Sequence, residues 1–154
     1  MGVELAYKLY FEGKTKAAKK IVKRLVERSE NPKALFLYAL ICYQDKELYE
    51  AYNALERAIN ADSEFFEAWI LRAKILRHMK RYSEAIESLD RAYELRLNKE
   101  DYEDYEILIL KAEIYLEMGR TDLARREIRK IKEINPFDDD ILLLEQKLGS
   151  EKGS

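Results

Sequence analysis

The sequence has little of what disulfide-linked, metal-binding or membrane-spanning proteins need. Its single cysteine, Cys42, cannot form a disulfide within the chain. Its single histidine, His78, excludes a metal cluster or a catalytic pair built from histidines. The longest apolar run, residues 34–43, falls well short of the ~20 residues that a membrane-spanning helix requires.

Glycine and proline are also scarce, and their scarcity favours helices. The 154 residues include only five glycines and two prolines, and runs of β-branched residues are missing. Such a composition is typical of an all-α chain with short turns. The N-terminus lacks the basic, apolar and cleavage regions of a secretory signal peptide. We therefore expect a cytoplasmic protein of one domain's length.

Motifs of catalysis are missing as well. No phosphate-binding glycine loop, zinc-ligand spacing or Ser/His/Asp set occurs in the sequence. Carboxylate pairs such as Asp101 and Asp104 lie in an acidic stretch without the apolar surroundings that raise a pKa. We therefore predict that the chain is not an enzyme and has no catalytic residues, no metal and no cofactor.

A small residue recurs along the chain at nearly constant steps. Ala18, Ala51, Ala85 and Ala124 are separated by 33, 34 and 39 residues. A second alanine precedes each of them by 12 positions, at Ala6, Ala39, Ala73 and Ala112. A period near 34 with two helical half-patterns is the signature of stacked helix pairs. Each pair needs its neighbours, because one pair cannot bury its apolar stripe alone.

These units resemble the tetratricopeptide repeat (TPR), in which large apolar, small and aromatic residues alternate on two helices. The match is clearest in the third unit, which reads Trp69, Ala73, Leu76, Tyr82, Ala85, Leu89 and Ala92. The resemblance implies an all-α fold, a right-handed superhelical solenoid of antiparallel helix pairs. Arg72 and Lys111 depart from the family pattern, which prefers leucine just before the small residue.

The register of the repeats predicts the organisation of the chain. We predict a single domain over residues 1–148 and a flexible tail over 149–154. The repeats cover about 1–32, 33–65, 66–98 and 104–137, and a capping helix covers 139–148. The expected helices cover about 2–12, 14–29, 33–44, 47–60, 64–79, 82–97, 101–118, 121–134 and 139–148. About five extra residues fall near 97–106. We expect Asp62 or Ser63 to cap the fifth helix and Trp69 to be largely buried.

In TPR arrays the first helix of each pair lines a concave groove that binds peptides. The resemblance assigns this role to Tyr7, Tyr10, Phe36, Leu40, Tyr43, Ile70, Lys74, Arg77, His78, Ile109 and Glu113. The helix expected at 33–44 is apolar around its whole circumference, so Phe36, Leu40 and Tyr43 exceed what a core needs. An exposed stripe of such residues marks an interaction site. Alternatively, these side chains fill the inner curve by packing on one another.

Charged groups narrow the class of partner. Lys74, Arg77 and His78 form a basic cluster that either holds an acidic residue of a peptide or is a solvated face. Charged residues make up 38% of the chain, which is typical of proteins from thermophiles, although an exposed helical array explains the excess equally well. The net charge of −2 argues against nucleic-acid binding, because domains that bind nucleic acids usually carry a basic surface.

The leading hypothesis is a scaffold that docks an extended or helical segment of another protein in an apolar concave groove. The alternative is a structural module that self-associates as a homodimer through its apolar N-terminal surface. RNA binding, as in related helical repeats, ranks below both. We therefore predict a protein or peptide partner, with no nucleic acid and no membrane.

Overall fold

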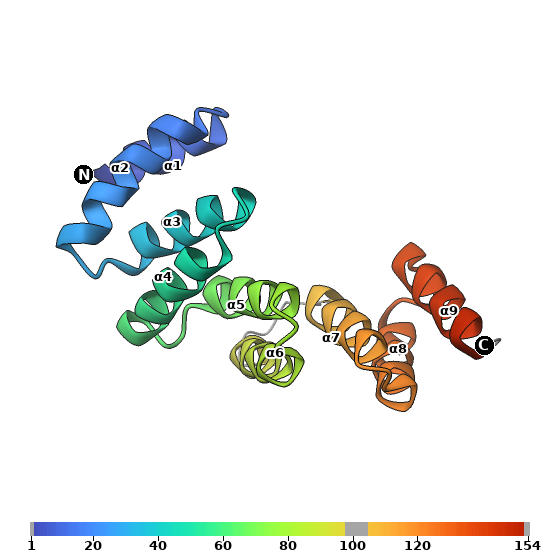
Figure 1. The fold of residues 1–154 in the computed structure, drawn as a ribbon. Coiled ribbons are helices and arrows are strands. Elements are labelled where there is room, and N and C mark those ends of the chain that lie inside the picture. Colours follow the sequence, from blue (N-terminus) through green and yellow to red (C-terminus); the bar gives the residue numbers. More distant parts are fainter. Residues whose placement is uncertain (1, 98–104, 153–154) are drawn as a thin grey trace. The chain divides into compact units, whose positions relative to one another are not determined.

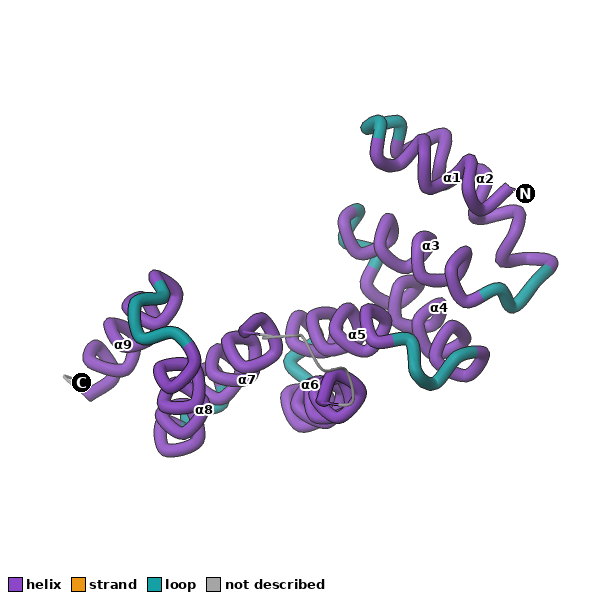
Figure 2. Tube along the Cα trace, turned by 180° about the vertical axis from the view of Figure 1, so that it is seen from behind, coloured by secondary structure: helices purple, strands orange, loops and turns teal. Residues whose placement is uncertain are grey.

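The computed structural model describes residues 2–97 and 105–152, and these residues form nine helices joined by short turns (Figures 1 and 2). The helices are α1 (Gly2–Phe11), α2 (Thr15–Arg28), α3 (Pro32–Gln44), α4 (Leu48–Ala61), α5 (Phe66–His78), α6 (Tyr82–Leu97), α7 (Tyr105–Glu117), α8 (Thr121–Ile134) and α9 (Asp139–Lys152). The predicted all-α fold class is confirmed.

Most predicted helix ends lie within two residues of the observed ones, and three details differ. The fifth helix begins after Phe65, which makes no side-chain capping bond; Asp62 instead accepts a bond from the backbone N–H of Glu64 at 3.1 Å. The last helix continues to Lys152, beyond its predicted end at 148. The expected start of the seventh helix, at 101–104, and most of the predicted insertion near 97–106 lie outside the described residues.

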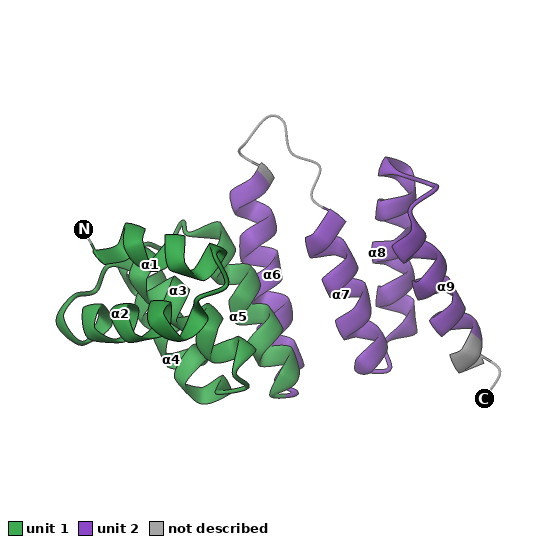
Figure 3. Cartoon of the chain, turned by 90° about the horizontal axis from the view of Figure 1, so that it is seen from above, with its two compact units in different colours: residues 1–79 green, residues 80–154 purple. Residues whose placement is uncertain are grey.

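The chain divides into two compact units, residues 1–79 and 80–154 (Figure 3). In the first unit, α3 packs against α1, α2, α4 and α5. In the second unit, α7 packs against α6, α8 and α9. The helix α9 also packs against α8 and buries Ile141, Leu144 and Leu148. The third predicted repeat, 66–98, contributes α5 to one unit and α6 to the other.

The periodic alanines lie in the core between packed helices. The eight periodic alanines identified in the sequence are all at most 1% exposed. Two helices approach within about 8–10 Å only if the side chains at their crossing are short. The alanine periodicity is therefore a core periodicity, and the side chains available to a partner lie on other faces of the helices.

The turns between the two helices of each repeat share one backbone conformation. Gly13, Lys46, Lys80 and Gly119 have φ of 82°, 64°, 61° and 76°, and each stands five positions before a periodic alanine. At three of these turns the next backbone N–H donates to a carbonyl five residues earlier at 2.8 Å, in Lys14 to Leu9, Glu47 to Cys42 and Arg120 to Tyr115. This is the bonding pattern with which a left-handed residue ends a helix.

Lys46 occupies a conformation that glycine adopts without steric cost. A left-handed residue other than glycine loses about 1–2 kcal/mol, whereas glycine loses about 0.5–1 kcal/mol more conformational entropy on folding than alanine. We expect Lys46→Gly to raise the free energy of unfolding by about 0.5–1 kcal/mol, measured by urea denaturation. Gly119→Ala should lower it, although nothing lies within 4 Å of the added methyl group. An unchanged stability in both variants would contradict this account.

The two departures from the family pattern form equivalent ion pairs between neighbouring helices. Arg72 on α5 pairs with Glu56 on α4 at 2.5 Å, and Lys111 on α7 pairs with Asp90 on α6 at 2.7 Å. Glu56 and Asp90 each stand five positions after a periodic alanine, so the two pairs repeat one geometry. A cation and an acid therefore replace an apolar contact at this place in both units.

In the second unit this ion pair extends into the core. The Lys111 ammonium also lies 3.5 Å from Glu127, and their side chains are only 12% and 4% exposed. Lys130 approaches the same carboxylate at 3.5 Å, and Glu127 Oε2 has no hydrogen-bond partner among the described atoms. Burial disfavours charged Lys111, but the hydrogen bond to Asp90 and the charge of Glu127 outweigh it, so the pKa of Lys111 is raised.

We expect Lys111→Met to lower the free energy of unfolding by about 3 kcal/mol at pH 7, because it leaves Glu127 buried without its main counter-charge. The double variant with Glu127→Leu should recover most of that loss. Since the folded-state pKa of Lys111 lies above the ordinary value of about 10.4, its stabilisation is complete below that pH and is lost as the pH rises through the folded value.

Urea denaturation at pH 7, 9 and 11 measures this effect, and Lys130→Met, at an exposed side chain, is the matched control. The control should change the free energy of unfolding by less than about 1 kcal/mol. A deficit of Lys111→Met that stayed the same at pH 11 would show that lost packing, rather than lost charge, is responsible.

Candidate functional site

An open depression of about 570 Å³ lies on the first helices of the repeats in the first unit. Its lining, called here the aromatic depression, consists of Val3, Glu4, Tyr7, Lys33, Phe36, Phe65 and Glu67. These residues come from α1, from α3 and from the start of α5. The helix α3 contacts both α1 and α5, which places the three segments side by side. Tyr7 and Phe36 are thus brought together, as the predicted groove requires.

Tyr7 is held in place at the wall of the depression. Its hydroxyl donates a hydrogen bond of 2.8 Å to the backbone carbonyl of Lys33, which ties α1 to the start of α3. Burial and, in second place, the negative charge of Glu67 raise the pKa of Tyr7 to about 12. The phenol is therefore neutral at physiological pH and presents an uncharged ring.

Two phenylalanines form another wall of the depression. The rings of Phe36 and Phe65 have centroids 5.0 Å apart and an interplanar angle of 38°. Both side chains are half-buried and pack against the core of the first unit. Phe65 was not among the predicted site residues because it stands in the turn before α5. The sequence does contain a signal for Phe65, the adjacent pair Phe65–Phe66. Only one of two neighbouring residues at the start of a helix needs to face the core, so the other is available at the surface.

The remaining predicted residues of α1 and α3 make contacts nearer the other ends of these helices. Tyr10 accepts a hydrogen bond of 2.5 Å from the Gln44 side chain. Tyr43 and His78 are joined by a hydrogen bond of 2.9 Å, with ring centroids 5.5 Å apart. Leu40 is half-buried and packs against the core. Phe36, Leu40 and Tyr43 thus each pack against the core on one side and are exposed on the other.

The predicted residues on α5 are less available than expected. Ile70 is only 7% exposed, so it belongs mainly to the core and offers little surface to a partner. Lys74 and Arg77 are half-buried and engaged in other interactions. Ile109 and Glu113 lie on α7, in the second unit, and both are half-buried.

Trp69 was expected to be largely buried, and the structure shows a half-buried side chain. The side chain is partly exposed, and its indole N–H donates to the carbonyl of Ser63 at 2.9 Å. The guanidinium of Arg72 lies 5.9 Å from the Trp69 ring. The ring therefore packs along the charged side of α5, because Phe66, Ile70 and other neighbours fill the core side of this helix.

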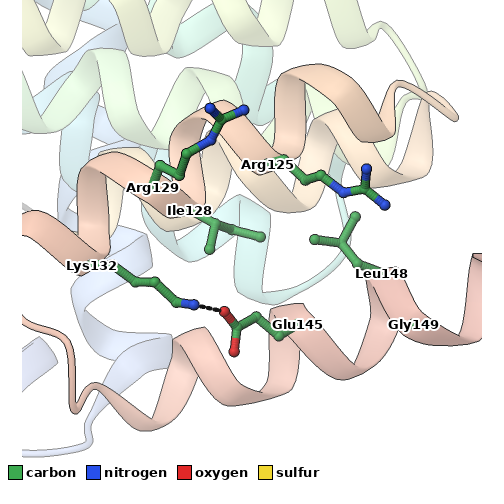
Figure 4. A pocket seen from close by; sticks show the side chains of 7 residues that line it. All are labelled: Arg125, Ile128, Arg129, Lys132, Glu145, Leu148 and Gly149. Atoms are coloured by element: carbon green, nitrogen blue, oxygen red, sulfur yellow. Dashed lines mark ion pairs between the residues drawn. The ribbon is translucent and has the colours of Figure 1, made fainter.

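A second depression, of about 320 Å³, lies between α8 and α9 (Figure 4). Arg125, Arg129 and Lys132 approach it from α8, and Glu145 approaches from α9 and forms an ion pair with Lys132. Its apolar lining is small, limited to Ile128 and Leu148.

A third depression, of about 440 Å³, lies along α2 and is lined by Ala17, Lys20, Ile21, Arg24 and Leu25.

Two other kinds of site were sought in the described part of the chain. None of its helices combines the length and the apolar character that crossing a membrane requires. Within residues 2–97 and 105–152, no three or more His, Cys, Asp or Glu side chains come together in a way that could hold a metal ion. Cys42, the one free thiol, is buried, and burial raises its pKa. The aromatic depression is the candidate site, because its lining includes Tyr7 and Phe36 of the predicted groove.

The electrostatic influence of Glu67 on Tyr7 is open to a direct test. We expect Glu67→Gln to lower the pKa of Tyr7 by roughly half a pH unit, because one nearby negative charge is removed while burial is retained. The pKa follows from the ¹³Cζ shift of labelled tyrosines between pH 9 and 13, with Tyr7→Phe assigning the signal. Tyr38, whose pKa burial also raises to about 12, is the internal control and should not change.

Comparison with known families identifies the repeat family. Residues 12–92, more than half of the chain, match the family model described as anaphase-promoting complex, cyclosome, subunit 3. Residues 76–148 match a tetratricopeptide repeat model. No curated protein matches the sequence.

Solved structures share the fold at low sequence identity. A crystal structure of MamA protein is 18% identical over 86% of this chain and 70% of that one, with a TM-score of 0.77. A chain of the APC/C hetero-tetramer Cut9–Hcn1 is 17% identical over 96% of this chain and 29% of that one, with a TM-score of 0.82. A tetratricopeptide repeat protein from Parabacteroides merdae is 17% identical over 99% and 59%, with a TM-score of 0.81. At these identities the likeness shows the fold alone.

Proposed function

The chain belongs to the tetratricopeptide-repeat family, and from this premise we propose that its first unit binds a peptide segment of a partner protein in the aromatic depression. Proteins of this family are interaction scaffolds, generally without catalytic activity, and we assign this chain the same non-catalytic role. The binding residues would be Tyr7, Phe36 and Phe65, with Tyr10, Leu40, Tyr43 and His78 extending the surface along α1, α3 and α5.

One observation carries this proposal. The aromatic depression combines three half-buried rings with a volume of about 570 Å³. Hydrophobic pockets with a few polar groups are where proteins bury the side chains of their ligands. Aromatic residues in such pockets carry much of the affinity of protein interfaces. The rings are also fixed in the free protein by the Tyr7–Lys33 bond and the Phe36–Phe65 contact, so little ordering entropy is lost on binding.

Selection from a random peptide display library provides ligands when the natural partner is unknown. We expect binding of the selected peptides to weaken at least tenfold in Phe36→Ala, because loss of an aromatic anchor at an interface typically costs more than about 1–2 kcal/mol. Fluorescence anisotropy with a labelled selected peptide measures the dissociation constant, and circular dichroism checks that the variant remains folded.

Tyr49→Ala is the matched control, since Tyr49 is an aromatic residue of the same unit that is 70% exposed and does not line the depression. It should bind the selected peptides as the unmodified protein does. Peptides that bind the Phe36→Ala variant undiminished, or that lose binding in the Tyr49→Ala variant, would move the binding surface away from the aromatic depression.

Self-association through the N-terminal surface is the second candidate function. The depression along α2 supports it, because Ala17, Ile21 and Leu25 form an apolar strip beside Lys20 and Arg24. Leu5 on α1 is also 50% exposed. An adaptor is a monomer before its ligand arrives, and we expect sedimentation at micromolar concentration to show a monomer. A dimer that Ile21→Glu dissociates would favour the alternative instead.

A further inference from the structure

We infer that the aromatic depression recognises a basic side chain, lysine or arginine, of the bound peptide. This inference rests on the proposed function, because it names the residue type that the peptide places there. It follows from the combination of ring faces with one carboxylate, Glu67, at the edge of the same depression.

The rings provide a surface that attracts cations. Faces of aromatic rings carry negative electrostatic potential, and an ammonium or guanidinium within about 6 Å of a ring centroid is attracted to it. Phe36 and Phe65 lie side by side with centroids 5.0 Å apart, and the neutral ring of Tyr7 lines the same space. The long aliphatic stem of lysine or arginine would bury apolar area against these rings while the charged end reaches the rim.

Glu67 supplies the complementary charge. It is exposed, it lies in the first turn of α5, and it has no ion pair or hydrogen bond with any residue in the described part of the chain. Glu67 and Tyr7 line the same depression.

The other charged groups of the depression shape this preference. Glu4 also lines the depression but is engaged in other interactions, so Glu67 is the carboxylate assigned to the ligand. Lys33 is exposed, and solvent screens its charge. It still opposes a run of consecutive basic residues, so the fitting segment carries one basic residue with neutral or acidic neighbours. An acidic ligand side chain would meet Glu67, and a neutral one would desolvate that carboxylate without pairing it.

Single blocked amino acids are suitable probes of this site. The N-acetyl methylamides of arginine, lysine, norleucine and glutamate are titrated at millimolar concentration into ¹³C-phenylalanine-labelled protein, and the ring signals of Phe36 and Phe65 are followed by NMR. We expect the arginine and lysine probes to bind most tightly, the norleucine probe to bind more weakly, and the glutamate probe to leave both signals nearly unchanged. Glu67→Gln should weaken the basic probes by roughly twofold to fivefold, the range of an exposed ion pair.

The outcomes separate this inference from the proposed function. The basic-residue inference would be overturned if the norleucine probe bound as tightly as the lysine probe. It would also be overturned if Glu67→Gln did not weaken binding of the basic probes. Display-selected peptides that lack a basic residue but still require Phe36 would do the same and leave peptide binding in place. Selected peptides whose affinity is unchanged in both Phe36→Ala and Glu67→Gln would overturn the proposed function itself. Glu67 is exposed, so Glu67→Gln should leave the fold intact, and circular dichroism checks this.

Discussion

The close approach of helices at alanine positions is the constraint on which the rest of the structure depends. All eight periodic alanines are essentially inaccessible to solvent. Because these positions can hold no larger side chain, the adjoining helix faces must carry the large apolar residues that fill the remaining space, such as Leu35, Leu55 and Leu76. The faces that point elsewhere are then free to carry aromatic or charged groups. The aromatic depression of the first unit is built on such faces of α1, α3 and the start of α5.

Helix positions were predictable because the same pattern recurs, so that each repeat corroborates the others. The partners of Arg72 and Lys111 were not predictable. Both residues were recognised as departures from the family pattern, but the sequence alone does not align α5 with α4 or α7 with α6. Only the structure shows that Glu56 and Asp90 lie opposite these cations. The left-handed turns were half predictable, since glycine signals them at Gly13 and Gly119 while lysine at 46 and 80 does not.

The candidate site was predictable to a similar extent. The register placed Tyr7 and Phe36 on neighbouring helices, and both line the same depression. It could not find Phe65, because a residue in a turn has no helical periodicity to reveal its direction. The register also assigned Ile70 to the groove, whereas this side chain is buried in the structure. Periodicity identifies the face of a helix, but the exposed fraction of each side chain depends on what the neighbouring helices leave uncovered.

The burial of the single thiol has a consequence for measuring local stability. Cys42 is fully inaccessible in α3, and burial raises its pKa, so a thiol reagent can modify it only when the surrounding helices separate. The chain has no other cysteine, and Cys42 lies in the first of the two compact units. Its alkylation rate therefore reports how often residues 1–79 open, irrespective of fluctuations confined to the other half of the chain.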